Sequence, residues 1–388
     1  MMDVAAQIRA DPTLPATLAE QVREQLSWLI ARGDLAPGDQ LPSVRSLAAG
    51  LGINYHTVRS AYRRLEADGL LETRPGRRSR VARFDPRHLW PPGSATRTHV
   101  VGVVVPSLGP FYVELLEGAL DAARSAGILL TVATTGDDQA LALQSIAQLA
   151  AKGADGVVVV SHDISNLVAG DEEAPGGRSL PLVAVDRPGS LGLSVEADLE
   201  GAGYLLARHL VEDGHREIGF VTLEAPPSNV VPIEAGYRRA LAEDGLRADE
   251  RHVNRVGAWG LEAGEAAADR LLAGTGRPTA LVAIADLLAI GAMRRLRRAG
   301  VLVPRDIAVT GIDDSPFAAL VDPPLTSVAL PARAMGAEAV AVLQRVWGDA
   351  APAPTRSVLE VRLAIRDSCG PHASRPRSSA HVDTNGRS

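Results

Sequence analysis

In the first part of the chain, hydrophobic residues recur at helical spacing. An amphipathic helix is predicted over 15–32, where they return every three or four positions. Two shorter helices follow: Ser43 is a suitable N-cap for the first, Asn54 for the second, and Gly52 breaks the chain between them. Over 70–83 two short hydrophobic stretches flank a Pro-Gly pair, which predicts a β-hairpin.

From residue 100 onwards, short apolar runs alternate with amphipathic segments. The runs predict buried strands and the segments between them predict helices. The predicted strands are 100–105, 129–134, 156–160, 182–185, 218–221, 281–284 and 307–311, and the predicted helices are 111–126, 140–152, 199–213, 233–245 and 287–299. This alternation indicates an α/β fold with parallel sheets covered by helices on both faces. Ligands of such folds bind beyond the carboxyl ends of the strands.

Length and charge divide the chain into unequal parts. Its 388 residues, 46% of them hydrophobic, suffice for two or three domains. Residues 1–97 hold 14 Arg against 10 acidic residues, a formal charge of +4, whereas the remainder carries −10. Six of those arginines lie between Arg74 and Arg87. Such a cluster indicates either a nucleic-acid contact or a solvated, arginine-rich loop, and charge alone leaves both interpretations open.

Several protein classes are excluded by what the sequence lacks. Lys152 is the only lysine and lies at a predicted helix end, so we expect neither a phosphate-binding Gly-Lys-Ser/Thr loop nor a pyridoxal-phosphate Schiff base. Cys369 is the only cysteine, which excludes internal disulfides and multi-cysteine metal sites. The apolar runs fall far short of the roughly 20 residues that cross a bilayer, and the sequence shows no secretory signal. We expect a cytoplasmic protein with no cofactor and no membrane partner.

Two short helices separated by a glycine turn are the arrangement of a helix-turn-helix. The second of them places Arg59 and Arg63 one turn apart, outside its apolar stripe, so both face the same side. The hairpin that follows has arginines at its tip and along one strand, as a basic wing does. A recognition helix reads the major groove of DNA, and such a wing reaches phosphates or the minor groove.

Five motifs in this part are specific. They are Leu41-Pro42-Ser43-Val44-Arg45, Gly52-Ile53-Asn54, Thr57-Val58-Arg59, Leu65-Glu66-Ala67-Asp68-Gly69-Leu70 and Pro75-Gly76. Together they resemble the GntR-type winged helix over about 15–83. That resemblance implies contacts with double-stranded DNA from Arg45, Asn54, Tyr55, His56, Thr57, Arg59, Arg74, Gly76 and Arg77. Tyr55 and Pro75 depart from the residues common in the family, which bears on base preference. For each polar residue the alternative is a solvated helix face.

A second series of motifs follows in a fixed order. It includes Val101-Gly102-Val103-Val104-Val105-Pro106, Gly109-Pro110-Phe111-Tyr112, Val183-Ala184-Val185-Asp186-Arg187, Asp213-Gly214-His215-Arg216, Gly236-Tyr237-Arg238, Ala285-Asp286-Leu287, Gly311-Ile312-Asp313-Asp314 and Pro323-Pro324-Leu325-Thr326. Over about 98–367 this series resembles the sensor of the LacI/GalR family, a pair of lobes like those of periplasmic binding proteins. The resemblance implies three crossings between lobes, near 186–187, 314–322 and 355.

By the same resemblance, a small molecule binds in the cleft between the lobes. The expected ligand contacts are Phe111, Tyr112, Asp186, Trp259, Asp286 and Asp313. A sugar fits such a set, because its apolar face stacks on aromatic rings and its hydroxyls bond to carboxylates. Instead of contacting a ligand, the three aromatic residues could belong to the core of a lobe, and Asp286 could be the N-cap of a helix.

One position departs from the family pattern. Ile233 stands three residues before Gly236, where the family often has an arginine. Loss of a charged donor there is expected to weaken recognition of the usual sugars. The ligand is then a less polar sugar or another small metabolite, or the sensor has lost its ligand.

Together these observations define the expected organisation. The predicted parts are a winged helix-turn-helix domain at 1–83, a linker at 84–97, a two-lobed sensor at 98–368 and a disordered tail at 369–388. We expect a homodimeric transcriptional regulator, of the repressor type common among relatives of this sensor, that binds a near-palindromic operator and responds to a small molecule. The alternatives are a regulator without ligand response, a secreted solute-binding protein and a cofactor-dependent enzyme.

Overall fold

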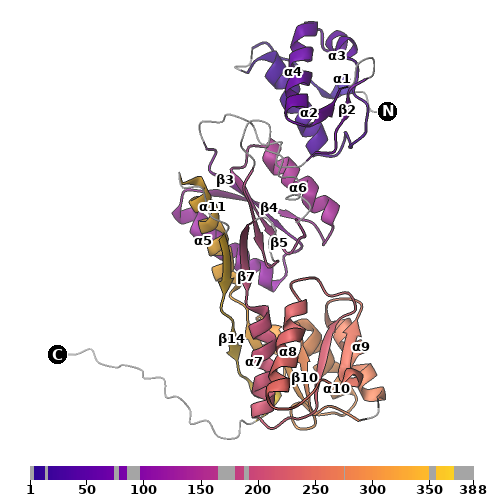
Figure 1. The fold of residues 1–388 in the computed structure, drawn as a ribbon, viewed down its shortest axis with the longest axis vertical. Coiled ribbons are helices and arrows are strands. Elements are labelled where there is room, and N and C mark those ends of the chain that lie inside the picture. Colours follow the sequence, from indigo (N-terminus) through magenta and orange to yellow (C-terminus); the bar gives the residue numbers. More distant parts are fainter. Residues whose placement is uncertain are drawn as a thin grey trace, which may run out of the picture. The chain divides into compact units, whose positions relative to one another are not determined.

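The chain divides into two compact units. The computed structural model describes residues 4–13, 16–73, 78–84, 97–164, 180–187, 192–274, 276–348 and 355–370. One unit is Met1–Ala197 with Pro331–Leu359, and the other is Asp198–Leu330 with Glu360–Ser388. The first unit contains a helical head (residues 4–84) and an α/β part, here called lobe 1. The second unit is a single α/β part, lobe 2 (Figure 1).

Helices and a short hairpin form the head. Its described elements are α1 (Val4–Gln7), α2 (Leu18–Ala31), α3 (Val44–Leu51), α4 (Tyr55–Ala67), β1 (Leu71–Glu72) and β2 (Arg80–Val81). Ser43 caps α3 by accepting a hydrogen bond from the Ser46 amide at 3.1 Å. Asn54 caps α4 by accepting from the His56 amide at 2.8 Å, and Gly52 ends α3 in the left-handed conformation. Both predicted caps and the glycine break are confirmed.

Two polar contacts fix α4 against its neighbours. The buried Tyr62 hydroxyl donates to the Pro42 carbonyl at 2.8 Å, which ties α4 to the segment before α3. Arg23 on α2 pairs with Asp68, the C-cap of α4, at 3.2 Å. Fully buried leucines, among them Leu47 and Leu65, fill the space between these helices. The outer face of α4 is therefore held in one orientation.

Lobe 1 is a parallel sheet with helices on its faces. Its elements are β3 (Val100–Val105), α5 (Pro110–Ser125), β4 (Leu129–Thr134), α6 (Gln139–Ala151), β5 (Gly156–Val160), β6 (Leu182–Val185), β7 (Leu193–Ala197), α11 (Ala332–Trp347) and β13 (Thr355–Leu359). The strand order is β13-β7-β6-β5-β3-β4, and all neighbours run parallel. β5 and β6 are buried along their whole length, as their apolar sequences require.

Lobe 2 repeats this plan with one antiparallel strand. Its elements are α7 (Leu199–Glu212), β8 (Ile218–Leu223), α8 (Val231–Glu243), η3 (Glu250–His252), β9 (Val253–Val256), α9 (Leu261–Ala273), β10 (Ala280–Ala283), α10 (Asp286–Arg298), β11 (Ala308–Asp313), β12 (Thr326–Ala329), β14 (Arg362–Ala364) and η4 (Asp367–Cys369). The strand order is β14-β12-β11-β10-β8-β9. β14 pairs antiparallel with β12, which departs from the all-parallel prediction.

The chain leaves each unit later than predicted. It passes between units after Ala197, Leu330 and Leu359, against predicted crossings near 186–187, 314–322 and 355. In each case one further strand joins a sheet before the crossing, namely β7, β12 and β13. The tail was predicted to begin at Cys369, but Cys369 is buried in η4. Residues 85–96 of the predicted linker and 371–388 of the tail lie outside the described residues.

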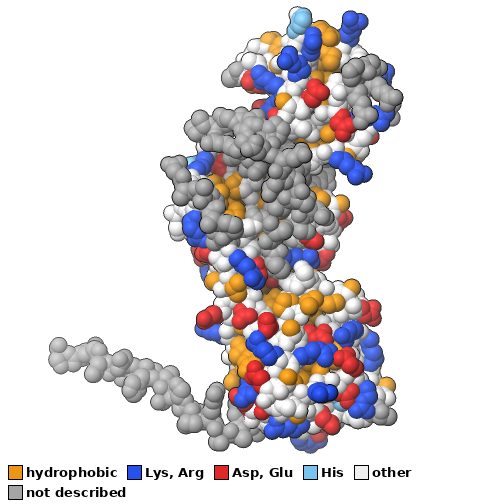
Figure 2. Space-filling view, viewed as in Figure 1, with side chains coloured by type: hydrophobic (Ala, Val, Ile, Leu, Met, Phe, Trp, Pro, Cys, Tyr) orange, Lys and Arg blue, Asp and Glu red, His pale blue; other side chains and the backbone are white. Residues whose placement is uncertain are grey.

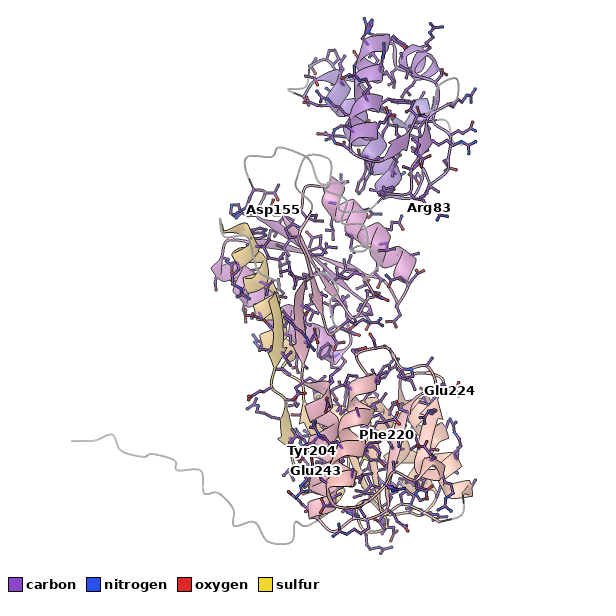
Figure 3. The ribbon with its side chains drawn as sticks, viewed as in Figure 1. Arg83, Asp155, Tyr204, Phe220, Glu224 and Glu243 are labelled. Atoms are coloured by element: carbon purple, nitrogen blue, oxygen red, sulfur yellow. The ribbon has the colours of Figure 1, made fainter. Side chains whose placement is uncertain are left out.

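Glycine pairs let the covering helices approach each other closely. In the pairs α5–α11, α7–α8 and α9–α10, each helix has a glycine against a backbone carbonyl of its partner. The six residues are Gly118, Gly336, Gly203, Gly236, Gly264 and Gly291. A Cβ atom at any of them would lie 1.8 to 2.1 Å from a carbonyl oxygen of the partner helix. In lobe 2 the Tyr204 hydroxyl also donates to Glu243 at 2.7 Å, from α7 to α8 (Figure 3).

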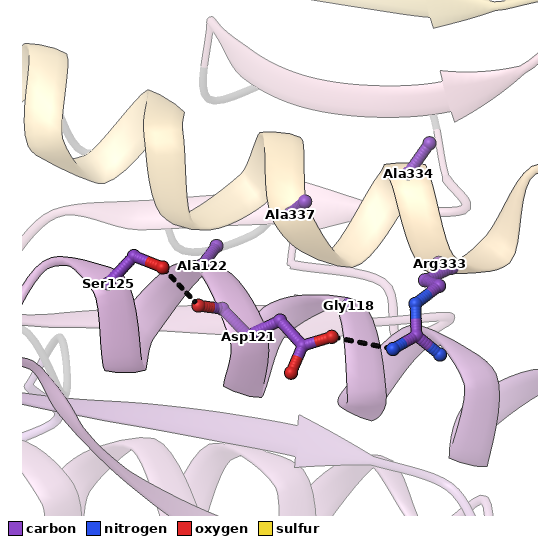
Figure 4. Close-up of a pocket in the computed structure, with 7 residues that line it drawn as sticks. All are labelled: Gly118, Asp121, Ala122, Ser125, Arg333, Ala334 and Ala337. Atoms are coloured by element: carbon purple, nitrogen blue, oxygen red, sulfur yellow. Dashed lines mark hydrogen bonds and ion pairs between the residues drawn. The ribbon is translucent and has the colours of Figure 1, made fainter. Parts of the chain in front are cut away.

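Small side chains next to Gly118 leave a shallow groove between α5 and α11. The groove has a volume of about 530 Å³ and is lined by Gly118, Asp121, Ala122, Ser125, Arg333, Ala334 and Ala337. Arg333 on α11 pairs across it with Asp121 at 2.5 Å (Figure 4), and it also pairs with Glu117 at 2.6 Å. These side chains are more than half exposed, so the pairs add little stability. Close backbone packing, rather than the ion pairs, holds the two helices together.

We predict that Gly118→Ala destabilises the protein. Alanine favours helix by about 1 kcal/mol over glycine, but its Cβ would lie 1.8 Å from the Arg333 carbonyl oxygen, and overpacking of this kind costs about 1–3 kcal/mol or more. Ser125→Ala on the same helix is the control, because Ser125 is exposed. Urea denaturation should show a net loss for Gly118→Ala and none for Ser125→Ala. A Gly118→Ala protein as stable as the wild type would contradict the close packing.

Candidate functional site

The start of α4 presents exposed polar side chains. Of the predicted DNA contacts that the structure describes, Arg45, Asn54, Tyr55, His56 and Arg59 are exposed and Thr57 is half-buried. Arg45 lies in the first turn of α3, and the others follow in order from the N-cap of α4 into its second turn. The sequence therefore places all six on or beside the two helices of the helix-turn-helix. Figure 2 shows Lys and Arg side chains on the exposed surface of the head.

Arginines on this surface lack protein partners, unlike those on the inner faces. Within the described residues, no hydrogen bond or ion pair engages the guanidinium of Arg45, Arg59 or Arg63. By contrast, Arg23 pairs with Asp68 and Arg64 pairs with Glu20 at 3.4 Å. Arg59 lies in the second turn of α4, close to the N-terminus, where the helix dipole also favours an anion. This surface is suited to phosphate and base contacts.

The hairpin after α4 is only partly described. β1 and β2 pair antiparallel, with Leu71 opposite Val81 and Glu72 opposite Arg80. Arg80 in β2 is exposed, and so is Arg78, two residues before that strand. The predicted contacts Arg74, Gly76 and Arg77 lie outside the described residues, so the structure gives no account of them.

In lobe 1, polar side chains meet at the carboxyl ends of the strands. Ser161 directly follows β5 and Asp186 directly follows β6, and the Ser161 hydroxyl donates to the Asp186 carboxylate at 2.7 Å. The Tyr112 hydroxyl, from the first turn of α5, lies 3.5 Å from the Ser161 oxygen. The structure thus brings Tyr112 and Asp186 together, through a serine that the sequence analysis missed. Phe111 packs edge-on against Tyr112, with ring centroids 5.4 Å apart.

Backbone strain accompanies this cluster. Ser161 and Asp186 have φ values of 57° and 63°, in the left-handed region that residues other than glycine rarely adopt. Such strain persists where surrounding contacts impose it, and it is concentrated at binding sites. Each residue comes directly after a fully buried strand, and the polar bond between their side chains holds both turns.

A buried histidine lies next to the cluster. The Thr135 hydroxyl and His162 Nε2 are 2.6 Å apart, and both residues are buried. Burial lowers the pKa of His162, which favours the neutral ring. This pair anchors the loops that follow β4 and β5. Thr135, Ser161 and His162 directly follow predicted strands. Polar residues in that place are the sequence feature by which they could have been predicted as site residues.

In lobe 2, Asp286 organises the strand ends from a buried position. Asp286 has no exposed surface, and its two carboxylate oxygens accept from the Ser327 hydroxyl at 2.6 Å and the Ser315 amide at 2.7 Å. The N-cap of α10 is Ala285, so the N-cap role that we left open for Asp286 is wrong. Burial is the main cause that raises the pKa of Asp286, to about 6. In this structure Asp286 holds the loop after β11 rather than facing solvent.

Two further carboxylates lie where β11 passes into that loop, Asp313 at the end of the strand and Asp314 directly after it. Asp313 and Asp314 have φ values of 118° and 51°, and both are half-buried. Asp314 pairs with Arg366 at 2.6 Å, and its amide donates to the Ser327 hydroxyl at 3.0 Å. The network therefore links Asp286, through Ser327, to the strained loop that contains the predicted contact Asp313.

Trp259 is a surface residue rather than lobe core. Its side chain is 49% exposed in the turn between β9 and α9. The core of lobe 2 uses another aromatic pair, in which Phe220 stacks on Tyr237 with centroids 4.7 Å apart. Ile233, at the position where the family often has an arginine, is buried, and its carbonyl faces Gly203.

Comparison with known proteins gives a consistent result. Residues 18–81 match the bacterial regulatory proteins of the gntR family, and residues 207–369 match the periplasmic binding protein-like domain. The HTH-type transcriptional regulator DegA of Bacillus subtilis is 30% identical over 281 residues, which are 71% of this chain and 82% of DegA. The HTH-type transcriptional regulator CelR of Thermobifida fusca is 32% identical over 349 residues, 84% of this chain and 98% of CelR.

A solved structure described as a transcriptional regulator CelR–cellobiose complex matches with a TM-score of 0.62 and 28% identity, over 84% of this chain and all of that one. A helix-turn-helix head joined to a two-lobed α/β sensor defines a DNA-binding transcriptional regulator. The chain belongs to the LacI/GalR family of these regulators, with a head of the GntR type. None of the helices in the described part of the chain is long and apolar enough to cross a membrane.

We predict a distinct pH dependence for Asp286. Because its pKa in the folded protein is raised to about 6, the protonated form stabilises the fold at low pH, and this contribution is lost as pH rises from about 4 to 6. The free energy of unfolding of wild type relative to Asp286→Asn should therefore fall over this window, by about 1.4 kcal/mol per pH unit at most. Urea denaturation of both proteins at several pH values measures it. A difference that stays constant or grows with pH would refute the assignment.

Proposed function

We propose that the head binds a near-palindromic operator through the exposed face of α4 and that a small molecule bound by the sensor changes the affinity for that operator. The observation that carries the DNA contact is the set of exposed, unpaired arginines on α3 and α4. Arg59 and Arg63 lie one turn apart along α4, and Arg45 lies on α3. Asn54, Tyr55, His56 and Thr57 contact base edges or phosphates, and Arg74, Gly76 and Arg77 of the wing contact the backbone.

The proposed effector contacts lie at the strand ends of each lobe. In lobe 1 they are Phe111, Tyr112 and Asp186, supported by the Ser161 hydroxyl between the last two. In lobe 2 they are the exposed Trp259 and the half-buried Asp313. Asp286 acts on the effector by holding the Asp313–Ser315 loop, since its own carboxylate is enclosed. Strained strand-end turns with aromatic neighbours suit a ligand that has both an apolar face and hydroxyls.

A sugar is the proposed effector class. CelR, which is similar over 84% of this chain, has been solved with cellobiose. An aromatic ring such as Trp259 stacks on the apolar face of a sugar, and carboxylates such as Asp186 accept from its hydroxyls. Ile233 cannot supply a charged donor, which favours a sugar with fewer anionic or strongly polar substituents. Release of the operator by the bound sugar is the proposed sign of the response.

A homodimer is the proposed DNA-binding form. Two heads related by a two-fold axis would match a near-palindromic operator. The edge strand β4 of lobe 1 leaves Leu129 65% exposed and Val132 42% exposed, and α5, which contacts β4, exposes Val113 and Leu120. Apolar side chains at an unprotected sheet edge favour a protein partner, and a second copy of lobe 1 is the partner that also pairs the heads.

We predict that Arg59→Ala weakens specific operator binding by about 1–3 kcal/mol, roughly 5–150-fold, because it removes an unpaired cation from the recognition face. Arg64→Ala is the matched control: it lies on the same helix, but its guanidinium faces α2 and pairs with Glu20. Gel shifts with the DNA upstream of the gene measure both. Equal losses in the two variants, or none in either, would show that α4 does not face DNA in the proposed way.

We predict that Leu129→Asp raises the dimer dissociation constant by at least about tenfold, because it places a charge in an apolar interface. Leu320→Asp in lobe 2 is the control, since Leu320 is 79% exposed and lies far along the chain from β4. Sedimentation velocity over a range of protein concentrations measures the effect. A wild-type protein that is monomeric, or a Leu129→Asp protein that dimerises as well as wild type, would contradict the proposed interface.

A further inference from the structure

A cluster of three potential metal ligands lies in lobe 2, away from the strand-end residues described above. His209 and Asp213 come from the last turn and the C-cap of α7, and Cys369 comes from η4. His209 Nε2 lies 3.2 Å from Cys369 Sγ and 3.4 Å from Asp213 Oδ2. All three potential ligand atoms lie within 4.8 Å of one another. The proposed regulatory function uses none of these side chains.

The secondary structure fixes two of the three ligands. His209 and Asp213 are four residues apart on α7, so both side chains project from one face of the helix. This is the spacing at which helices present pairs of metal ligands. The C-terminus of a helix also carries partial negative charge, which favours a bound cation.

Hydrogen bonds hold the third ligand in place. Ser368 next to Cys369 donates from its amide to the Pro324 carbonyl at 3.0 Å and from its hydroxyl to the Val309 carbonyl at 2.6 Å. The Thr326 amide donates to the Ser368 hydroxyl at 2.8 Å. These bonds anchor η4 to the sheet through β11 and β12. The position of Cys369 next to α7 is therefore fixed by the sheet.

Two of the three distances between ligand atoms are close to those around a small tetrahedral cation. Zinc–nitrogen bonds of about 2.0–2.1 Å and zinc–sulfur bonds of about 2.3 Å place neighbouring ligand atoms roughly 3.3–3.6 Å apart. The two distances from His209 Nε2, 3.2 and 3.4 Å, already approach this spacing. Asp213 has a side chain that is 16% exposed, so it has room to turn toward Cys369 and offers a route from solvent.

The chemistry of the ligand set selects the metal. The imidazole nitrogen is a borderline ligand and the thiolate is a soft one, and together with one carboxylate they suit Zn²⁺ rather than Ca²⁺ or Mg²⁺. Thr326 Oγ1 lies 2.9 Å from Cys369 Sγ, where a hydroxyl can donate to a metal-bound thiolate.

We propose that His209, Asp213 and Cys369 form a zinc site with three protein ligands. The ion would link the end of α7 to η4 and so fasten the C-terminal end of the described chain to lobe 2. Binding is expected to release the thiol proton and to stabilise lobe 2 in proportion to the occupancy of the site.

The test uses full-length protein freed of metal by a chelator under reducing conditions. Zinc competition with a chromogenic chelator should give one tightly bound ion per chain, and Co²⁺ should show a thiolate-to-metal charge-transfer band. Zinc should also slow the alkylation of Cys369. Since Cys369 is the only cysteine in the chain, any thiol signal belongs to it.

Variants separate this site from other histidines. Cys369→Ser and His209→Gln should each weaken zinc binding by roughly 100-fold or more, because even a residue that only supports a ligand costs 10–100-fold. His215→Gln is the matched control: it lies in the same lobe, outside the cluster, and bonds Thr279. It should bind zinc as the wild type does.

Three results would overturn the proposal. They are wild-type protein that takes up no zinc, zinc that leaves the alkylation rate of Cys369 unchanged, and zinc that binds equally to wild type, Cys369→Ser and His209→Gln. The alkylation assay needs only the wild type, so it decides the matter even if Cys369→Ser fails to fold.

Discussion

Parallel pairing of buried strands is the constraint on which the rest of the structure depends. In each lobe the parallel strands end at one edge, so the residues that follow them come together there from distant parts of the sequence. Strands buried on both faces need helices on both sides, and the three glycine pairs let those helices approach to backbone contact. The same arrangement thus provides the core and gathers Ser161 with Asp186 in lobe 1, and Asp286 with Ser315 and Ser327 in lobe 2. Side chains could not be held in left-handed turns at these edges unless the strands before them were rigid.

The exposed surface of the head has a different character from the strand-end clusters, because it presents arginine side chains that have no ion-pair partner among the described residues. The inner Arg23 is paired with Asp68, whereas the exposed arginines of α3 and α4 named above have no partner in the part of the chain that is described. The Tyr62 bond to the Pro42 carbonyl and the buried leucines hold that face outward. In the proposed function, this helix face contacts DNA without first having to break an internal ion pair.

Much of this could be predicted from the sequence, and the failures have physical causes. The caps Ser43 and Asn54 are local signals, and the long apolar runs of β3 and β5 have no other stable placement. The strands β7, β12, β13 and β14 were missed because they are short and mix polar with apolar residues, and each is defined by the sheet that it joins. For that reason the crossings were placed too early. Asp286 does not cap α10; two serines from distant loops bond to its carboxylate, and no local pattern reveals these bonds. The lone Cys369 likewise excluded multi-cysteine sites but gave no sign of His209, 160 residues away.

The central claim is that a small molecule at the strand ends of the sensor controls the affinity of the head for DNA. The most direct measurement is the fluorescence anisotropy of labelled operator DNA, titrated with wild-type and Trp259→Ala protein in the presence of single sugars, cellobiose among them. The account predicts that at least one sugar changes the operator dissociation constant of the wild type by roughly 5–150-fold. It predicts that Trp259→Ala binds the operator equally well without sugar and responds weakly or not at all, because the exposed ring that stacks on the sugar is gone. A wild-type affinity that no sugar alters, or a Trp259→Ala protein with an undiminished response, would contradict it.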